Sequence, residues 1–257
     1  MTTHLNAKSA GTPTWADHAS PDAEAARNFY HAVFGWQYDI GGPEYGGYTT
    51  ARLGTHPVVG LSAIPESMPD LKPSWGLFFA SDDANADAAR AEALGATITF
   101  PVMEVGPFGS MVHLKDPSGA SFSLWQAASH VGWQVSNEPG AVACHELYSP
   151  DAQASRDFYT AMLHATAEPM PGDMEYYTLK HGDDPICGIM QIQPEWGQMP
   201  AQWVSYFAVA NADETVALVK EHGGKNMGPI DDSPFGRIAA LMDPFGALFK
   251  IVQPPVG

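Results

Sequence analysis

The sequence predicts an α+β protein of two tandem domains, each made of two modules with the order strand, helix, three strands. Two internal repeats support this fold class. The segment Ser20 to Trp36, SPDAEAARNFYHAVFGW, returns at Ser149 to Ala165 as SPDAQASRDFYTAMLHA. The segment Gly106 to Gln126 returns at Asp232 to Gln253. The offset is 129 residues in the first pair and 127 at the Asp-Pro turn of the second, so one structural unit has been duplicated.

The length of the chain agrees with this duplication. With 257 residues it has room for two domains of ordinary size, each able to bury its own core. We predict one domain at residues 1–128 and the other at residues 129–257. A linker at about residues 127–140 joins them, because that segment matches nothing in either repeat.

The elements of the first half follow from periodicity and from turn residues. A strand at Thr14 to Ala19 precedes a helix that runs to about Phe34, with Ser20 as its N-cap and Pro21 at its first helical position. Gly35 ends this helix. The further elements expected here are strands at 36–40, 48–53, 57–64 and 75–80, a helix at 84–94, and strands at 97–100, 110–114 and 121–126.

The second half follows the same order. Its first strand is expected at Val142 to Tyr148 and its first helix at Ala152 to Leu163. A second helix is expected at Ala212 to His222, closed by two glycines. The turn that begins at Asp243 leads into a last strand at Ala247 to Val252.

The composition excludes several classes of partner. The chain has 12 Lys and Arg against 29 Asp and Glu, a formal charge of −17, which repels nucleic acids and anionic membranes. Only Cys144 and Cys187 are present, so no duplicated disulfide framework exists. The N-terminus lacks the pattern of a signal peptide, and no apolar stretch reaches membrane-spanning length. We expect a soluble cytoplasmic protein, monomer or homodimer, whose partner is a small molecule.

Three motifs together point to a known family. They are the SPDxxxxxxFYxxxFGW stretch, the helix that ends in ALGA, and the DPxGA turn before the last strand. In their order, spacing and duplication they resemble the glyoxalase, bleomycin-resistance and extradiol-dioxygenase superfamily, also called vicinal oxygen chelate proteins. The resemblance implies that each domain curls its strands into a half-open cup. In metal-dependent members, His, Glu or Gln side chains of the first, fourth, fifth and eighth strands hold a metal inside that cup.

The residues at the corresponding positions do not suit a metal. No carboxylate or His lies inside the fourth strands, and a divalent cation needs about three or four protein donors. We therefore expect no metal and no other cofactor, with a divalent metal held by other ligands as the alternative. The positions on the first, fifth and eighth strands carry Trp15, Gly76 and Ser123 in the first cup and Cys144, Val204 and Lys250 in the second.

Each cup keeps one carboxylate on its first strand. Strand alternation puts Asp17 on the same face as Trp15, and Glu146 on the same face as Cys144 and Tyr148. We take Glu146 and Asp17 as candidate catalytic acids or bases. The alternative is structural: an ion pair of Glu146 with Lys250, which the family arrangement brings within reach, and a backbone group capped by Asp17.

Other side chains could line the cups or belong to the core. Loop aromatics beside a strand end often touch a ligand, whereas strand aromatics more often fill a core. Cys144 could be a nucleophile or a small buried hydrophobe. His18 and His145 alternate to the opposite face, where we expect exposed or satisfied histidines. The candidate ligand-binding residues are Trp15, Phe78, Phe108, Ser123, Trp125, Cys144, Tyr148, Tyr206, Phe235 and Lys250.

These observations favour metal-independent binding of a small, largely apolar organic molecule, with acid-base chemistry of the isomerase, cyclase or lyase type as the enzymatic version. A metal-dependent glyoxalase-type lyase or dioxygenase is the first alternative. Non-catalytic sequestration of a drug or metabolite is the second, and cups filled by side chains are the third. Because the two copies differ at the ligand positions, we expect the cups to differ in what they hold.

Overall fold

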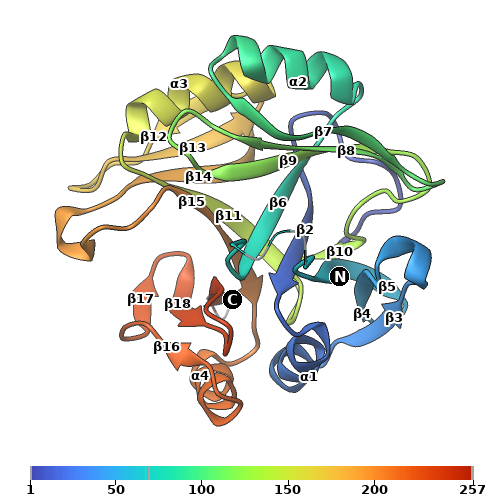
Figure 1. Cartoon of the computed structure of the whole chain (residues 1–257). Coiled ribbons are helices and arrows are strands. Elements are labelled where there is room, and N and C mark those ends of the chain that lie inside the picture. Colours follow the sequence, from blue (N-terminus) through green and yellow to red (C-terminus); the bar gives the residue numbers. More distant parts are fainter. Residues whose placement is uncertain (1, 67, 69, 256–257) are drawn as a thin grey trace.

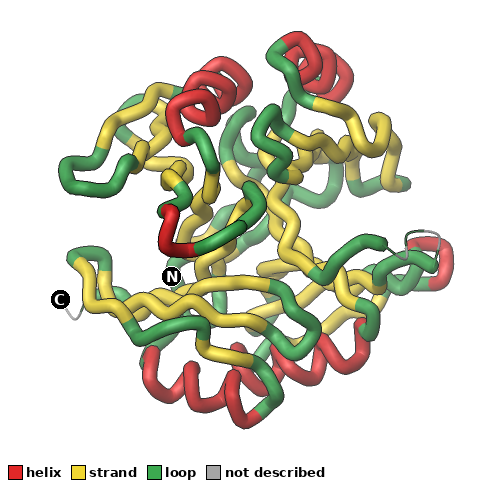
Figure 2. The backbone as a smooth tube through the Cα atoms, turned by 60° about the vertical axis from the view of Figure 1, so that its left-hand side comes forward, coloured by secondary structure: helices red, strands yellow, loops and turns green. Residues whose placement is uncertain are grey.

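The computed structural model describes residues 2–66, 68 and 70–255. Two mixed β-sheets form its centre, one of eight strands from the first half and one of nine from the second. Helices α2 and α3 lie on one side of the molecule and helices α1 and α4 on the other (Figure 1). In a second view the strands again lie between two groups of helices (Figure 2). The α+β architecture of paired modules is confirmed.

The first sheet has the strand order β3-β4-β5-β2-β6-β9-β8-β7, in which β2 and β6, the first strands of the two modules, lie at the centre. Module one comprises β2 (Pro13–Ser20), α1 (Ala23–Phe34), β3 (Gln37–Ile40), β4 (Thr49–Leu53) and β5 (His56–Ala63). Module two comprises β6 (Ser74–Ala80), α2 (Ala84–Ala93), β7 (Thr97–Val105), β8 (Gly109–Lys115) and β9 (Ser121–Ala127).

The second sheet repeats this order as β12-β13-β14-β11-β15-β19-β18-β16, with β17 paired to β18. Module three comprises β11 (Val142–Ser149), α3 (Ala152–Leu163), β12 (Thr166–Pro169), β13 (Tyr176–His181) and β14 (Asp184–Gln191). Module four comprises β15 (Gln202–Ala208), α4 (Ala212–Glu221), β16 (Lys225–Asn226), β17 (Asp231–Ser233), β18 (Gly236–Met242) and β19 (Leu248–Gln253). Two further strands, β1 (Thr2–Thr3) and β10 (Val135–Ser136), pair with each other. None of the described helices is long and apolar enough to cross a membrane.

The start of α1 differs from the sequence prediction. Its N-cap is Asp22, whose carboxylate accepts a hydrogen bond of 2.9 Å from the N–H of Ala25. Ser20 lies earlier and holds the N–H of Asp22 with its own hydroxyl at 3.1 Å. The assignment of Ser20 as N-cap and of Pro21 as the first helical residue is therefore wrong. Asp22 directly precedes the helix, so its carboxylate reaches the N–H of the third helical residue and caps the helix in place of Ser20.

The modules pair across the two repeats rather than only within them. Helix α1 contacts α4, and α2 contacts α3. Between α1 and the second sheet, the rings of Phe34 and Phe207 lie 5.1 Å apart. On the other side, the rings of Phe79 and Trp203 lie 5.4 Å apart. The two largest apolar clusters therefore contain side chains from both halves of the chain.

A buried tyrosine of the first helix joins the repeats. The hydroxyl of Tyr30 accepts a hydrogen bond of 3.0 Å from the indole N–H of Trp75 and donates one of 3.1 Å to Asp243 of the other repeat. Asp243 also lies 2.7 Å from Nε2 of buried His18. Burial raises the pKa of Asp243, but the hydrogen bonds from His18, Ala247 N–H and Tyr30 outweigh it and hold the pKa below its usual value.

The second repeat makes the equivalent contact with the first repeat. Tyr159 accepts a hydrogen bond of 2.9 Å from the indole N–H of Trp203 and donates one of 2.9 Å to Asp116. Tyr159 is the counterpart of Tyr30, and Asp116 that of Asp243. The position of His18 is taken by Leu147 in the second copy, so Asp116 has no matching imidazole. The repeated Phe-Tyr and Asp-Pro motifs are thus the two halves of a reciprocal contact between repeats.

His18 and His145 both face away from the inner side of their strands, as alternation predicts, and both are buried. The imidazole Nδ1 of His145 lies 3.1 Å from the hydroxyl of Ser205. One ring nitrogen of each histidine, Nδ1 of His18 and Nε2 of His145, lacks a hydrogen-bond partner among the described residues. Of the two alternatives expected, exposure is wrong for both histidines, and each ring has one hydrogen-bond partner, which for His18 is an aspartate of the other repeat.

The asymmetry of the two tyrosine contacts is testable. Tyr159→Phe leaves one oxygen of buried Asp116 without its donor, whereas Tyr30→Phe leaves Asp243 still bonded to His18. We expect each change to lower the free energy of unfolding by about 1–3 kcal/mol, with the larger loss for Tyr159→Phe. Urea unfolding measures both.

Tyr177→Phe is the control for these variants, because its hydroxyl donates to Glu175 of the same repeat rather than to a buried aspartate of the other, and its loss should cost little. Equal losses in Tyr30→Phe and Tyr159→Phe would contradict the importance of His18.

Candidate functional site

The face of each sheet that holds the expected ligand positions is called the first cup in the eight-stranded sheet and the second cup in the nine-stranded sheet. The strand register places the residues of each cup. In the first cup, Asp17 is opposite Gly60 of β5 and Gly76 of β6. In the second, Glu146 is opposite Gly188 of β14 and Val204 of β15.

An indole fills the middle of the first cup. Trp15 is only 3% exposed, and its N–H donates a hydrogen bond of 2.7 Å to the hydroxyl of Tyr48. The ring of His130 meets it edge-on with centroids 4.5 Å apart. Burial lowers the pKa of His130 to about 4, so this imidazole is neutral near pH 7.

The other residues predicted for the first cup pack against each other. Phe78 and Trp125 are buried, and the indole N–H of Trp125 donates to the carbonyl oxygen of His130 at 2.8 Å. The hydroxyl of Ser123 lies 2.6 Å from Nδ1 of His113 on the neighbouring strand. Phe108 lies at the rim, against the ring of Tyr45. This cup is therefore largely occupied by its own aromatic side chains.

Asp17 is the exception in the first cup. Its side chain is half-buried and lies over Gly76, where a Cβ atom would come within 2.7 Å of its Oδ1. Among the described residues it has neither a hydrogen bond nor an ion pair, so the predicted capping of a backbone group is wrong. Burial raises the pKa of Asp17 to about 7.

The second cup carries a much smaller side chain at the position that Trp15 occupies in the first. Cys144, the counterpart of Trp15, is exposed, and the prediction that it is a small buried hydrophobe is wrong. A thiol occupies far less volume than an indole, which leaves this wall accessible. Desolvation by the surrounding wall and the charge of Glu146 raise the pKa of Cys144 well above its usual range. The thiol is therefore protonated and unsuited to nucleophilic attack.

A polar network lies beside Cys144. Both oxygens of Glu146 accept hydrogen bonds, one from the hydroxyl of Tyr176 at 3.0 Å and the other from that of Tyr206. Lys250 Nζ donates to the Tyr206 hydroxyl at 2.6 Å and lies 3.7 Å from Glu146 Oε2. The expected proximity of Glu146 and Lys250 is confirmed. Four strands contribute to the network: β11, β13, β15 and β19.

Burial and neighbouring charges determine the protonation states of Tyr206 and Lys250. Burial and the charge of Glu146 raise the pKa of Tyr206 far above its usual value, so its hydroxyl keeps its proton. Burial lowers the pKa of Lys250, but the negative charge of Glu146 outweighs this and leaves the pKa above its ordinary value. Lys250 is therefore a cation throughout the neutral range.

Aromatic and sulfur-containing side chains surround the polar network. The ring of Tyr148 lies 5.1 Å from Lys250 Nζ and 5.6 Å from the ring of Trp196. Met190 packs against the cluster that contains Tyr148 and Tyr206. Phe235 is 62% exposed on the turn before β18, and no ring contact joins it to another described residue. Of the predicted ligand-binding residues, Cys144, Tyr148, Tyr206 and Lys250 lie together, while Phe235 lies apart from this network.

Sequence reasoning missed two tyrosines, Tyr48 and Tyr176. They are counterparts 128 residues apart, and this recurrence was a usable signal. Each hydroxyl lies over a glycine of the next strand, Gly60 and Gly188 respectively, where any Cβ atom would collide with it. The missing side chain is what lets each phenol reach across a strand to Trp15 in one cup and Glu146 in the other.

The residues at the ligand positions implied by the fold family do not fit a divalent metal. In the first cup an indole, a glycine and a serine occupy them, and in the second a thiol, a valine and an ammonium. An ammonium repels a metal cation and cannot donate electrons to it. Among the residues that the structure describes, no group of three or more His, Cys, Asp or Glu side chains could hold a metal ion.

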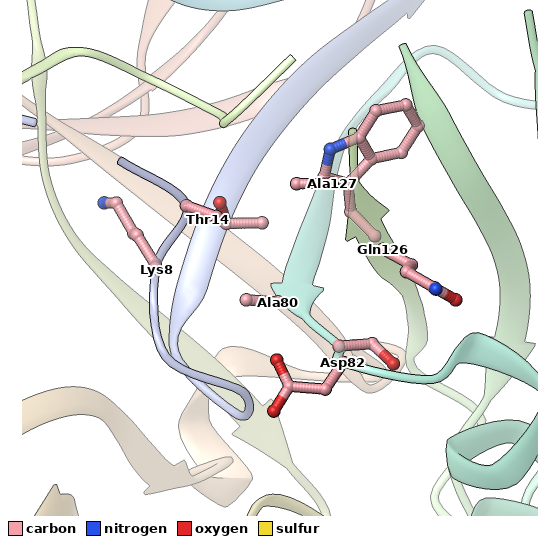
Figure 3. A pocket seen from close by; sticks show the side chains of 9 residues that line it. Lys8, Thr14, Ala80, Asp82, Gln126 and Ala127 are labelled. Atoms are coloured by element: carbon pink, nitrogen blue, oxygen red, sulfur yellow. The ribbon is translucent and has the colours of Figure 1, made fainter. Parts of the chain in front are cut away.

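A small cavity lies apart from the second cup, where the N-terminal segment crosses the ends of β2, β6 and β9 (Figure 3). Its volume is about 140 Å³, and Lys8, Thr14, Asp82 and Gln126 are among its lining residues. Lys8 Nζ lies 3.7 Å above the ring of Trp133, and burial lowers its pKa to about 7. Sites for organic ligands usually measure about 300–1,000 Å³, so we do not assign this cavity as the principal site.

Comparison with known proteins identifies the class to which this fold belongs. A family model described as a glyoxalase-like domain matches residues 15–125. A second model, the glyoxalase/bleomycin resistance protein/dioxygenase superfamily, matches residues 132–251. The protein named "Putative glyoxylase CFP32" from Mycobacterium bovis is 35% identical over 251 residues, covering 95% of each chain. The chain belongs to the glyoxalase/bleomycin resistance/dioxygenase superfamily, with two tandem glyoxalase-like domains.

Other relatives extend this comparison. The anthracycline biosynthesis protein DnrV of Streptomyces peucetius is 34% identical over 260 residues, covering 95% of this chain and 93% of its own. The Mn(II)-bound glyoxalase of Novosphingobium aromaticivorans has a similar fold, with a TM-score of 0.66 and 16% identity over 95% of this chain and 82% of its own. At that identity the solved structure supports the fold alone.

The titration of Asp17 can be measured through stability. Its pKa is about 7 in the folded chain and about 3.9 for an Asp in an unfolded chain. The folded state therefore binds the proton more tightly, and the stability that this contributes at low pH is lost as the pH rises from about 4 to about 7. We expect the wild type to lose stability relative to Asp17→Asn over this interval. Urea unfolding at several pH values compares them.

Asp82→Asn, a change at an exposed carboxyl, is the control for this experiment. Parallel stability curves for the wild type and Asp17→Asn would show that Asp17 titrates normally.

Proposed function

We propose that this protein binds a small, largely apolar organic molecule in the second cup and that Glu146 performs acid-base chemistry on it. The observation that carries the proposal is the contrast at one repeated position. Trp15 fills the first cup, whereas its counterpart Cys144 is exposed beside a carboxylate and an ammonium. An accessible wall next to a partly buried polar network is the usual arrangement of a ligand site.

The polar network supplies the chemical groups. The side chains of Glu146 and Lys250 are 12% and 15% exposed, so both are largely desolvated yet reachable from the cup. Two phenol hydroxyls hold the Glu146 carboxylate in place. A carboxylate held in this way can accept a proton from a bound molecule and return it at another atom, which is the proton transfer needed for isomerisation, cyclisation or elimination.

The surrounding residues favour an apolar ligand. Tyr148, Met190 and Val204, three largely apolar side chains, lie on the same face as the network. Two relatives, each covering nearly the whole chain, are named for anthracycline biosynthesis, which supports an organic metabolite rather than a macromolecule as the ligand. The formal charge of −17 likewise disfavours polyanions.

A metal-dependent lyase or dioxygenase is the rival function, since solved structures of similar fold include a Mn(II)-bound glyoxalase and several dioxygenases. Elemental analysis of protein purified without chelator separates the two. We expect less than stoichiometric metal and activity that survives chelation. Stoichiometric zinc, nickel, manganese or iron would overturn the metal-independent proposal.

The acid-base role can be tested with 2-tetralone, a flat apolar ketone that loses a proton next to its carbonyl. We expect the protein to accelerate exchange of this proton with D₂O, and Glu146→Gln to slow the catalysed exchange by roughly 10²-fold or more. Nuclear magnetic resonance follows the exchange. Asp17→Asn is the matched control, because its carboxylate lies in the filled cup and should leave the rate unchanged.

The other outcomes distinguish the remaining functions. Saturable binding without accelerated exchange would indicate sequestration rather than catalysis. If 2-tetralone and a panel of related flat molecules all fail to bind, the second cup is not a ligand site.

A further inference from the structure

We propose that the Lys250 ammonium takes the place of the family's metal and binds the oxyanion that an enol or phenol group of the ligand forms in the second cup. This inference rests on the proposed function, because it names the chemical class of the ligand at the same site. It starts from the mismatch between the side chains present and a metal ion: at the eighth-strand position where the family resemblance implies a metal ligand, this cup carries a cation.

Lys250 is positioned by its strand neighbours. It lies on β19 directly opposite Tyr206 of β15, and its Nζ donates to the hydroxyl of that residue at 2.6 Å. The rings of Tyr206 and Tyr148 lie 4.8 and 5.1 Å from Nζ, close enough for cation–π attraction. These contacts hold the ammonium at one point of the cup before any ligand arrives.

The ammonium keeps donor capacity for a ligand. It has three N–H groups, and Tyr206 takes one of them. Glu146 Oε2 lies 3.7 Å from Nζ, beyond a hydrogen bond. Even if the adjoining Tyr148 hydroxyl takes a second N–H, one donor remains. A donor with 15% side-chain exposure faces little competition from water, so its attraction for a negative oxygen is strengthened.

The charge balance selects the class of oxyanion. Glu146 and Lys250 together carry no net charge, and the phenols around them are neutral. A phosphate or another dianion would add charge that nothing in this network compensates. An enol or phenol enters neutral instead, and only its O–H bond breaks. The proton moves to the Glu146 carboxylate, and the new oxyanion pairs with Lys250, so the net charge of the cup does not change.

This step uses the two residues in different roles. Glu146 accepts the proton, directly or through the Tyr206 hydroxyl that bridges it to Lys250. Lys250, whose positive charge persists, stabilises the product of that transfer. A purely structural ion pair would bind neither species. The proposed oxyanion site and a purely structural ion pair therefore differ in one outcome: only the oxyanion site makes a phenol lose its proton when it binds in the cup.

The test uses 4-nitrophenol, whose phenolate absorbs visible light, and its neutral analogue 4-nitroanisole. At a pH below the phenol's own pKa, we expect wild-type protein to bind 4-nitrophenol and to produce the phenolate band. In Lys250→Met the band should disappear, and the affinity for 4-nitrophenol should fall by roughly 10-fold or more, as expected for loss of a charge-assisted hydrogen bond. The affinity for 4-nitroanisole should be unchanged.

Three further variants keep the test decisive. Lys180→Met removes a lysine that pairs with Glu168 on the surface of the same sheet and should behave like the wild type. Lys250→Arg retains the cation and should retain part of the band. This variant serves as the test if Lys250→Met fails to fold. In Glu146→Gln the ammonium loses its internal counter-charge, so we expect tighter binding of the phenolate above the pKa of the phenol, an effect opposite to that of Lys250→Met.

Binding of 4-nitrophenol as the neutral phenol, or an undiminished phenolate band in Lys250→Met, would overturn the role of Lys250 and leave the proposed function standing. Failure of both 4-nitrophenol and 4-nitroanisole to bind would instead overturn the second cup as their site, and with it the proposed function for this class of ligand.

Discussion

Two buried phenols, Tyr30 and Tyr159, hold the repeats together, and the geometry of both cups depends on them. Each phenol donates to an aspartate in the other repeat, Asp243 and Asp116 respectively. Those aspartates also organise the turn before the last strand of each sheet: one oxygen of Asp243 accepts the N–H groups of residues 245–247. Strand β19 begins directly afterwards and carries Lys250. The contact between repeats therefore positions the cation of the second cup.

Duplication explains why this framework is symmetric while the cups are not. The phenols and aspartates are retained in both copies because each copy needs its partner's residue to complete a buried hydrogen bond. Residues of the inner faces carry no such constraint. At one position the first copy has Trp15 and the second Cys144, and at another they have Ser123 and Lys250. One cup is filled with aromatic rings, and the other contains a partly buried polar network.

The second cup carries an ammonium at a position where the family resemblance implies a metal ligand. A metal needs several donors that converge on one point, whereas an ammonium needs only an anchoring acceptor and a nearby counter-charge. Tyr206 and Glu146 supply these to Lys250. The strand order is that of the family, while the side chains at the expected ligand positions differ. Membership of the superfamily thus indicates the location of the candidate site, and the side chains at that location determine its chemistry.

The sequence alone determined the fold and the placement of several candidate site residues, because both follow periodic patterns. The duplicated motifs predicted the modules, and strand alternation placed Glu146 with Cys144 and Tyr148, while the family resemblance implied that Lys250 lies near Glu146. Only the tertiary structure decided contacts that have no period in the chain. His18 meets Asp243 across 225 residues, and Tyr176 reaches Glu146 over a glycine of the intervening strand. Whether a cup is filled or open also depends on how side chains from several strands pack together, which no single strand specifies.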